Sequence, residues 1–144
     1  MATPYSLIHQ RALSKFTDYD ILHVPVQDRE RVLNQYLYSS IGEFAPVCRS
    51  DLSDRDEIIF QFNQDLTEAE VEILAIGEAY YWIQPHVLSS ENLHNMFSVK
   101  DASFFSPANL LKEMQALRDA LWKEFRRRIV DYTYRNGDIV TVGS

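Results

Sequence analysis

The chain has 144 residues, of which 46% are hydrophobic and 24% are charged, proportions that are ordinary for one globular domain. Its 14 basic and 21 acidic residues give a net charge of −7, which argues against a general nucleic-acid-binding protein, because such proteins carry a basic excess. Only 4 glycines and 5 prolines occur, so helices are favoured over an all-β sandwich or barrel. The single cysteine, Cys48, permits no internal disulfide and fits assembly in a reducing cytoplasm.

Two helices are predicted in the first third of the chain. Apolar residues at helical spacing indicate a helix over about 5–16 and a second over about 27–44. Pro46 ends the second helix, because the residue before a proline disfavours helical geometry. The polar, turn-rich stretch 47–56 is expected to be a loop.

A third helix is predicted to start at a capping box. Residues 58–63 alternate between apolar and polar and are expected to be extended. Thr67 and Glu70 then stand at the spacing at which each side chain satisfies a free backbone amide of a helix start. The helix should reach at least Ile83, after which Pro85 either kinks it or ends it.

The longest helix is expected near the C-terminus. Ser106 is a good N-cap and Pro107 suits the first helical position, and the pattern continues to about Arg135. One stripe contains Leu110, Met114, Leu117, Leu121, Phe125, Ile129 and Tyr132. Such a helix is roughly 43 Å long, so we expect its C-terminal end to protrude and to lead into the β-prone tail 138–142.

These elements predict an all-α fold with a four-helix, bundle-like and mostly antiparallel core. Any strand should be confined to the region of Phe60 and the tail. Residues 1–135 would form one helical domain, and residues 136–144 an extended C-terminal arm.

The sequence offers little for catalysis or metal binding. The four histidines form no metal-binding pair and are expected to be solvated or capping: His9, His23, His86 and His94. Cys48 lies beside Arg49, which can lower the pKa of a thiol, but no base stands nearby in the sequence. We therefore expect no enzyme activity, no metal and no cofactor.

Three charged or aromatic groups remain. The acidic run 51–57 lacks the spacing of a calcium loop and is expected to be a solvated loop. The arginines at 126–128 complement the dipole at a helix C-terminus or form a patch for an acidic partner. Tyr80, Tyr81 and Trp82 cannot all face one core, and Phe104–Phe105 either caps the next helix or contacts another subunit.

From about Glu57 to Asp138 the order of residue types resembles the head-to-tail connector, or neck adaptor, proteins of tailed bacteriophages. The matching segments, in chain order, are Ile58–Asn63, Leu66–Glu70, Glu72–Leu74, Tyr81–Ile83, Ser98–Asp101, Ser106–Leu111 and Asp131–Asn136. The first 56 residues take no part in the resemblance.

The resemblance implies a structural virion protein, located at the head–tail junction after assembly in the host cytoplasm. It would form a ring, usually a dodecamer, between the portal protein and a tail, stopper or terminator protein. Genomic DNA would pass through the lumen without sequence-specific binding, and no membrane would be involved. An acidic subunit suits this role, because like charge avoids tight binding to phosphates.

The resemblance also implies which residues make contacts. The family's C-terminal arm reaches onto the portal, which assigns portal binding to Arg135, Ile139, Val140, Thr141 and Val142. A β-prone tail after a helix is suited to pairing with a partner's sheet edge. Contacts with a neighbouring subunit or neck protein are expected from Lys100, Asp101, Phe104 and Phe105.

Two other classes of function fit the composition. A soluble helical assembly chaperone or regulator, for example for tails, would be a monomer or dimer and would not bind a portal ring stably. A helical hydrolase using His86 or His94 would need a clustered polar pocket, for which the sequence gives no sign.

Overall fold

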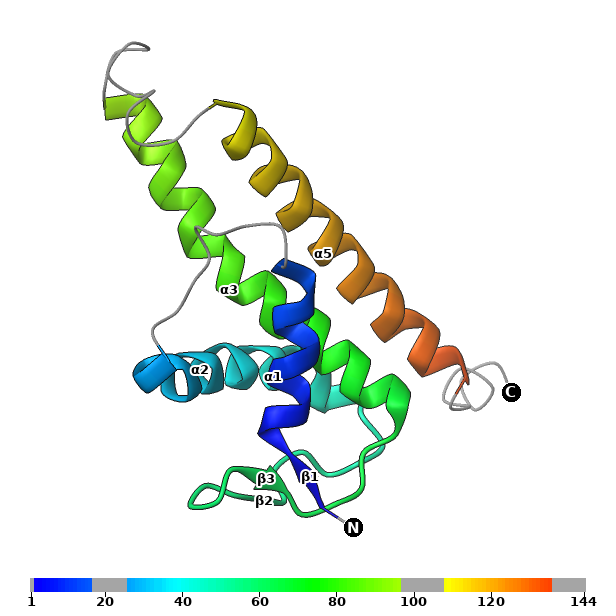
Figure 1. Cartoon of the computed structure of the whole chain (residues 1–144). Coiled ribbons are helices and arrows are strands. Elements are labelled where there is room, and N and C mark those ends of the chain that lie inside the picture. Colours follow the sequence, from blue (N-terminus) through cyan, green and yellow to red (C-terminus); the bar gives the residue numbers. More distant parts are fainter. Residues whose placement is uncertain (1, 17–25, 97–107, 136–144) are drawn as a thin grey trace.

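The computed structural model describes residues 2–16, 26–96 and 108–135 (Figure 1). It confirms an all-α, bundle-like fold with a small added sheet. The helices are α1 (Tyr5–Leu13), α2 (Val26–Phe44), α3 (Glu68–Met96) and α5 (Ala108–Arg135). Short 3₁₀ turns, η1 (Ser14–Phe16) and η3 (Ala45–Val47), extend α1 and α2. The strands are β1 (Thr3–Pro4), β2 (Arg55–Asp56) and β3 (Gln61–Phe62).

Helix α3 is the centre of the arrangement, since α1, α2 and α5 all pack against it. Its capping box forms as expected, with the Thr67 amide 2.9 Å from Glu70 Oε1 and the Glu70 amide 3.2 Å from Thr67 Oγ1. Pro85 does not end the helix, which continues to Met96. A proline inside a helix removes one hydrogen bond, and α3 tolerates that loss.

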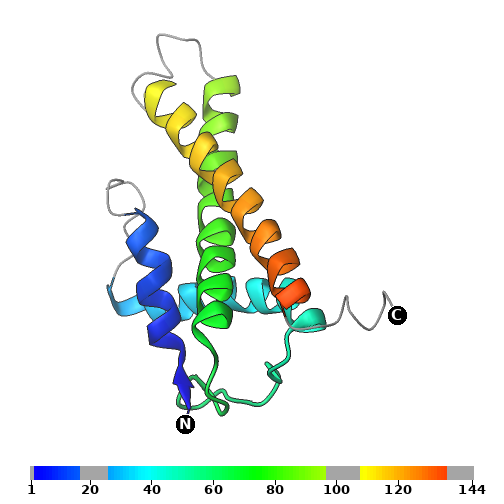
Figure 2. The same ribbon diagram turned by 90° about the vertical axis from the view of Figure 1, so that its right-hand side faces the viewer.

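The directions of the helices differ from the expected mostly antiparallel arrangement. Helix α5 runs antiparallel to α3, but α1 runs in the same direction as α3 and α2 crosses it steeply (Figures 1 and 2). The expectation is therefore wrong for α1 and α2. The sheet explains the direction of α1: β1 pairs with β3, so the chain enters α1 and α3 from the same end of the molecule.

The sheet has the order β1-β3-β2, and both pairings are antiparallel. The strand expected near Phe60 is present as β3, but β1 and β2 lie outside the predicted places, so 47–56 is not all loop. Thr3 explains β1, because its hydroxyl donates to the Gln64 carbonyl at 3.0 Å and accepts from the Leu66 amide at 2.9 Å. Strands of two residues carry too little alternation to be predicted.

The core extends along α3 and includes residues from each described helix. Its largest fully buried side chains are Tyr5, Ile8, Leu33, Leu37, Phe44, Leu52, Phe62, Leu74, Ile83, Met114 and Phe125. Gly77 allows the closest approach in this core. A Cβ at this position would lie 2.7 Å from Phe125 Cε1 and closer still to Ser40 Oγ, so α2 and α5 pack directly against the α3 backbone.

The projecting part of the molecule is opposite to the expected one. The C-terminal end of α5 is anchored, since Tyr132 is buried and its ring lies 5.0 Å from that of Phe44 in a T-shaped contact. The C-terminal half of α3 and the N-terminal half of α5 instead extend together beyond α1 and α2 (Figures 1 and 2). We call this two-helix projection, residues 84–96 and 108–118, the arm; it is distinct from the predicted C-terminal arm, residues 136–144.

The two helical glycines make a matched test of this packing. Gly77→Ala should lower the free energy of unfolding by about 1–3 kcal/mol, because overpacking forces neighbouring side chains to move. Gly42→Ala on α2 meets nothing within 4 Å and should instead raise stability by about 0.5–1 kcal/mol through lower chain entropy. Urea denaturation of both variants checks this, and a neutral or stabilising Gly77→Ala would show that the close approach is not a constraint.

Candidate functional site

A buried polar cluster connects three helices. His9 on α1 lies between Glu78 on α3 and Asn34 on α2, with 2.8 Å from Nδ1 to Glu78 Oε1 and 2.8 Å from Nε2 to Asn34 Oδ1. All three side chains are buried. The expectation that the histidines are solvated or capping is therefore wrong for His9, because α1 turns it toward α3 together with Ile8 and Ala12.

The geometry of this cluster suits a protonated histidine. An oxygen faces each ring nitrogen, and a ring protonated at both nitrogens donates to both. Burial alone would lower the pKa of His9, but the hydrogen bond and the charge of Glu78 outweigh it and raise that pKa. Burial raises the pKa of Glu78, whose Oε2 has no hydrogen-bond partner among the described residues. A substrate cannot reach groups this deep, so the cluster holds α1, α2 and α3 together.

The raised pKa of His9 makes stability depend on pH. Its contribution is complete below 6.5, the usual value, and is lost as the pH rises through the higher folded-state value. His9→Gln should lower the free energy of unfolding by roughly 3 kcal/mol at pH 6, as when one partner of a buried pair is removed. Above pH 6.5 its stability should fall less steeply with pH than that of the wild type.

His86→Gln provides the control for that measurement. Burial lowers the pKa of His86, so its linkage has the opposite sign and acts below pH 6.5. Denaturation curves from pH 5 to 9 for wild type and both variants test this account. A wild-type profile with the same slope above pH 6.5 as His9→Gln would contradict a protonated His9.

An open pocket of about 510 Å³ lies where the start of α3 meets the end of α5. It is lined by Arg49, Ser50, Gln64, Thr67, Ala69, Glu70, Ile73, Arg127, Arg128, Asp131, Tyr132 and Arg135. We call it the arginine pocket. Three segments that are distant in sequence form it, namely the turn at 49–50, residues 64–73 and the last turns of α5.

Glu70 forms the buried floor of the arginine pocket. Its carboxylate accepts hydrogen bonds from the Thr67 amide at 2.9 Å, Ser50 Oγ at 2.9 Å and Tyr132 Oη at 2.7 Å. Tyr132 Oη in turn accepts from the Arg49 amide at 2.9 Å. Burial would raise the pKa of Glu70, but these bonds outweigh it and hold the pKa below its usual value. The floor is thus a fixed negative charge joining α3, α5 and the turn.

Cys48 belongs to the same network and is not activated by Arg49. Its Sγ lies 3.4 Å from Glu70 Oε2, and burial together with the charge of Glu70 raises the thiol pKa to about 12. A thiol with a raised pKa is a poor nucleophile. Arg49 does not lower the thiol pKa, because the charge closest to the sulfur is the negative charge of Glu70.

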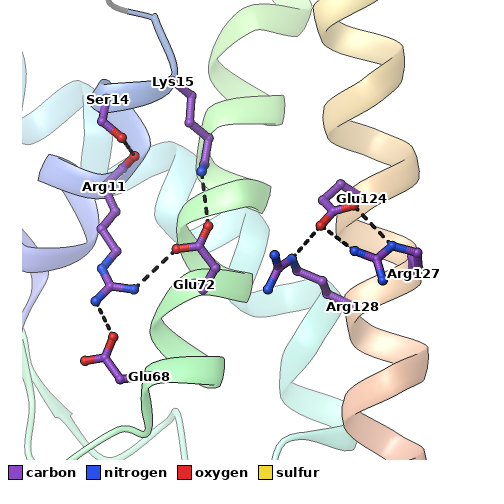
Figure 3. Close-up of polar contacts among 8 residues, drawn as sticks. All are labelled: Arg11, Ser14, Lys15, Glu68, Glu72, Glu124, Arg127 and Arg128. Atoms are coloured by element: carbon purple, nitrogen blue, oxygen red, sulfur yellow. Dashed lines mark hydrogen bonds and ion pairs between the residues drawn. The ribbon is translucent and has the colours of Figure 1, made fainter.

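The arginines of the pocket divide into two kinds. Arg127 and Arg128 are paired with Glu124 at 2.7 and 2.6 Å, and Arg128 reaches from α5 toward α3 (Figure 3). Arg49 and Arg135 are exposed, and neither forms an ion pair with another described residue. The pocket therefore has two positive charges at its rim that no carboxylate within the described chain neutralises.

A second group of ion pairs joins α1 to α3 outside the pocket. Glu72 accepts from Lys15 at 3.1 Å and from Arg11 at 3.3 Å, and Arg11 also contacts Glu68 (Figure 3). These side chains are partly exposed, and such pairs typically contribute less than about 1 kcal/mol each. They neutralise charges that would otherwise be available to a partner.

The structure describes only part of the predicted contact set. Arg135 lines the arginine pocket. Lys100, Asp101, Phe104, Phe105 and the tail residues Ile139–Val142 lie outside the described residues. The acidic run is largely exposed, as expected, and it is ordered by local contacts: Asp56 accepts from the amides of Ile58 and Ile59, and Glu57 accepts from Arg55. Trp82 is buried and Tyr80 and Tyr81 are half-buried, so the three aromatics indeed face different surroundings.

Sequence reasoning missed Arg49 and Glu70 as parts of one site. The capping box places Glu70 in the first turn of a helix, but no local pattern indicates that its carboxylate also accepts hydrogen bonds from Ser50 and Tyr132. The available signal was the apolar stripe ending at Tyr132, which predicts burial of the last turn of α5.

Within 2–16, 26–96 and 108–135, no group of three histidine, cysteine or carboxylate side chains is placed to hold a metal ion. No described helix is both long and apolar enough to cross a membrane. Comparison of the chain with protein-family models, with curated proteins and with solved structures gives no match.

Proposed function

We propose that this protein is a structural subunit of a phage neck, which forms a ring between the portal and the tail and joins head to tail. The proposal rests on the order of residue types from Glu57 to Asp138 that resembles neck adaptors. That stretch includes α3 and α5, which build the arm and, together with the turn at 49–50, the arginine pocket.

The arm is the structural observation that best supports this role. Beyond α1 and α2, the described parts of α3 and α5 lie side by side (Figures 1 and 2). Leu88 on the arm is 48% exposed, and Gln115 and Arg118 of α5 bind Glu91 of α3 at 2.8 and 3.8 Å. A projecting two-helix element suits docking between subunits. In the proposed ring, the segment that joins its ends, with Lys100, Asp101, Phe104 and Phe105, contacts a neighbouring subunit or neck protein.

The portal contact is assigned to the end of α5 and the tail. Arg135 is exposed at the anchored end of α5, on the rim of the arginine pocket. In this proposal Ile139, Val140, Thr141 and Val142 pair with a sheet edge of the portal. Binding of one strand costs about 1–2 kcal/mol per residue in conformational entropy, so a single copy would bind weakly. In a ring, binding of one copy raises the effective concentration of the others at the portal, which can raise avidity about 10²–10⁴-fold.

The proposal predicts a stable complex with portal rings. The purified chain mixed with its portal should coelute in size-exclusion chromatography with light scattering, at the mass of a ring bound to a ring. Deletion of residues 138–144 should leave the helical circular dichroism unchanged and abolish coelution.

The matched control replaces Thr141 and Val142 by other β-branched residues, Val and Ile, which preserve strand formation and should preserve binding. A monomer or dimer that never binds the portal would favour an assembly chaperone or regulator. Normal binding after the deletion would place the anchor elsewhere.

A further inference from the structure

The tip of the β2–β3 hairpin exposes the two most accessible large apolar residues among those described. Ile58 is 87% exposed and Ile59 is 61% exposed, whereas the other large apolar residues on the described surface reach at most 57%. Adjacent exposed isoleucines at the tip of a turn contribute nothing to the core of their own chain. An apolar patch of this kind commonly marks an interaction surface.

The hairpin tip is held rigidly in this exposed form. One carboxylate oxygen of Asp56 accepts from the amides of Ile58 and Ile59 at 2.8 and 3.1 Å. Phe60 follows with a φ of 57°, a left-handed geometry that closes the turn, and Tyr5 donates its amide to the Phe60 carbonyl at 3.0 Å. A fixed tip loses little entropy when it binds.

The arginine pocket is complementary to this tip in charge. The tip carries Asp54 and Asp56 beside its isoleucines, neither in an ion pair with another described residue, whereas Glu57 is paired with Arg55 of its own chain. The pocket has Arg49 and Arg135, which likewise form no ion pair with another described residue. The pocket volume of about 510 Å³ is in the range of sites that enclose a small ligand. Ala69 and the aliphatic stems of the exposed arginines provide apolar surface inside a charged rim.

The two surfaces lie on opposite sides of the molecule. The hairpin extends away from α5 below α2, whereas the arginine pocket lies beside the C-terminal end of α5 (Figure 1). A chain therefore cannot fill its own pocket with its own hairpin. A contact between two different surfaces is heterologous, and its repetition yields a ring when the rotation closes.

We propose that the hairpin tip of one copy of this chain, Ile58 and Ile59, occupies the arginine pocket of the next copy. Asp54 and Asp56 then lie against Arg49 and Arg135 of the neighbour, and the isoleucines leave water. This contact takes Arg135 out of the portal-binding set and leaves that role to the tail residues 139–142. The inference rests on the proposed function for the closure of the ring, but the head-to-tail contact itself is tested without any portal.

A mixing experiment separates this contact from every symmetric one. The tip variant carries Ile58→Ser and Ile59→Ser, and the pocket variant carries Arg49→Glu and Arg135→Glu. Each should associate about 100-fold more weakly than wild type. The tip variant loses the burial of two isoleucines, which amounts to at least that factor, and the pocket variant sets two glutamates against the aspartates of the tip. Mixed at equal amounts, the two variants should form a dimer and nothing larger, because each retains one intact surface.

Analytical ultracentrifugation measures the species, and circular dichroism establishes that each variant is folded. Leu7→Ser and Arg31→Glu are the matched controls, as an exposed apolar and an exposed basic residue elsewhere, and should associate like wild type. If the tip variant fails to fold, the single substitution Ile59→Asp replaces it; if the pocket variant fails to fold, Arg49→Gln replaces it.

Three results would overturn the proposal: a wild-type chain that stays monomeric at millimolar concentration, variants that associate normally, or variants that fail to rescue each other on mixing. Binding of inorganic phosphate by Arg49 and Arg135 with unchanged association would assign the pocket to an anion instead. Head-to-tail association without portal binding would remove the proposed function and leave this contact standing. If the tip variant still formed rings that bind the portal, the proposed function would stand and this contact would be removed.

Discussion

The structure depends on one region of α3, around Gly77 and Glu78, where α1, α2 and α5 all pack against it. This packing needs space for close approach and polar partners for a buried carboxylate. Gly77 offers bare backbone there, so Ser40 of α2 and Phe125 of α5 approach where a Cβ would block both. Glu78, the next residue, is fully buried, and His9 and Asn34 bring the polar partners that make its burial tolerable. A buried charge without such partners costs several kcal/mol. This requirement brings α1 and α2 against α3 at this point of the helix.

A second set of interactions fixes the other end of the molecule. Glu70 opens α3 and also receives Tyr132 from the last turn of α5 and Ser50 from the turn after α2. Together with the meeting point at Gly77, it clamps one half of the α3–α5 hairpin. In the other half, the polar contacts between the described parts of α3 and α5 are those of Glu91 with Gln115 and Arg118. This division into a clamped base and a projecting arm is what a subunit needs if it docks into neighbours while keeping its own fold.

Local signals predicted much of the fold. The capping box at Thr67 and Glu70, the stripe through Phe125 and Tyr132 and the proline at 46 gave the starts and ends of helices to within a few residues. They could not give the direction of α1, because it depends on the pairing of Thr3 with Phe62, which are far apart in the chain. Pro85 was ambiguous for a related reason, since packing and not propensity decides whether a helix continues through a proline.

The candidate site was less predictable than the fold. Arg135 was singled out only through the resemblance, and Arg49 was considered only as a neighbour of Cys48. The pocket exists because α5 returns antiparallel to the start of α3, which brings residues from three distant segments to one place. Likewise, His9 looks unremarkable in sequence until its carboxylate partner, 69 positions away, is identified. Long-range pairs of polar groups leave no periodic signal.

Native-state hydrogen exchange on the monomeric chain tests the division into base and arm most directly. Amides are protected in proportion to the free energy of the opening that exposes them. The account predicts that amides of 71–80 in α3 and 121–132 in α5 exchange only through global unfolding. Amides of 88–96 and 110–116 should exchange through openings of lower free energy and become protected on assembly. Equal protection along the whole length of α3 and α5 in the monomer would contradict the account.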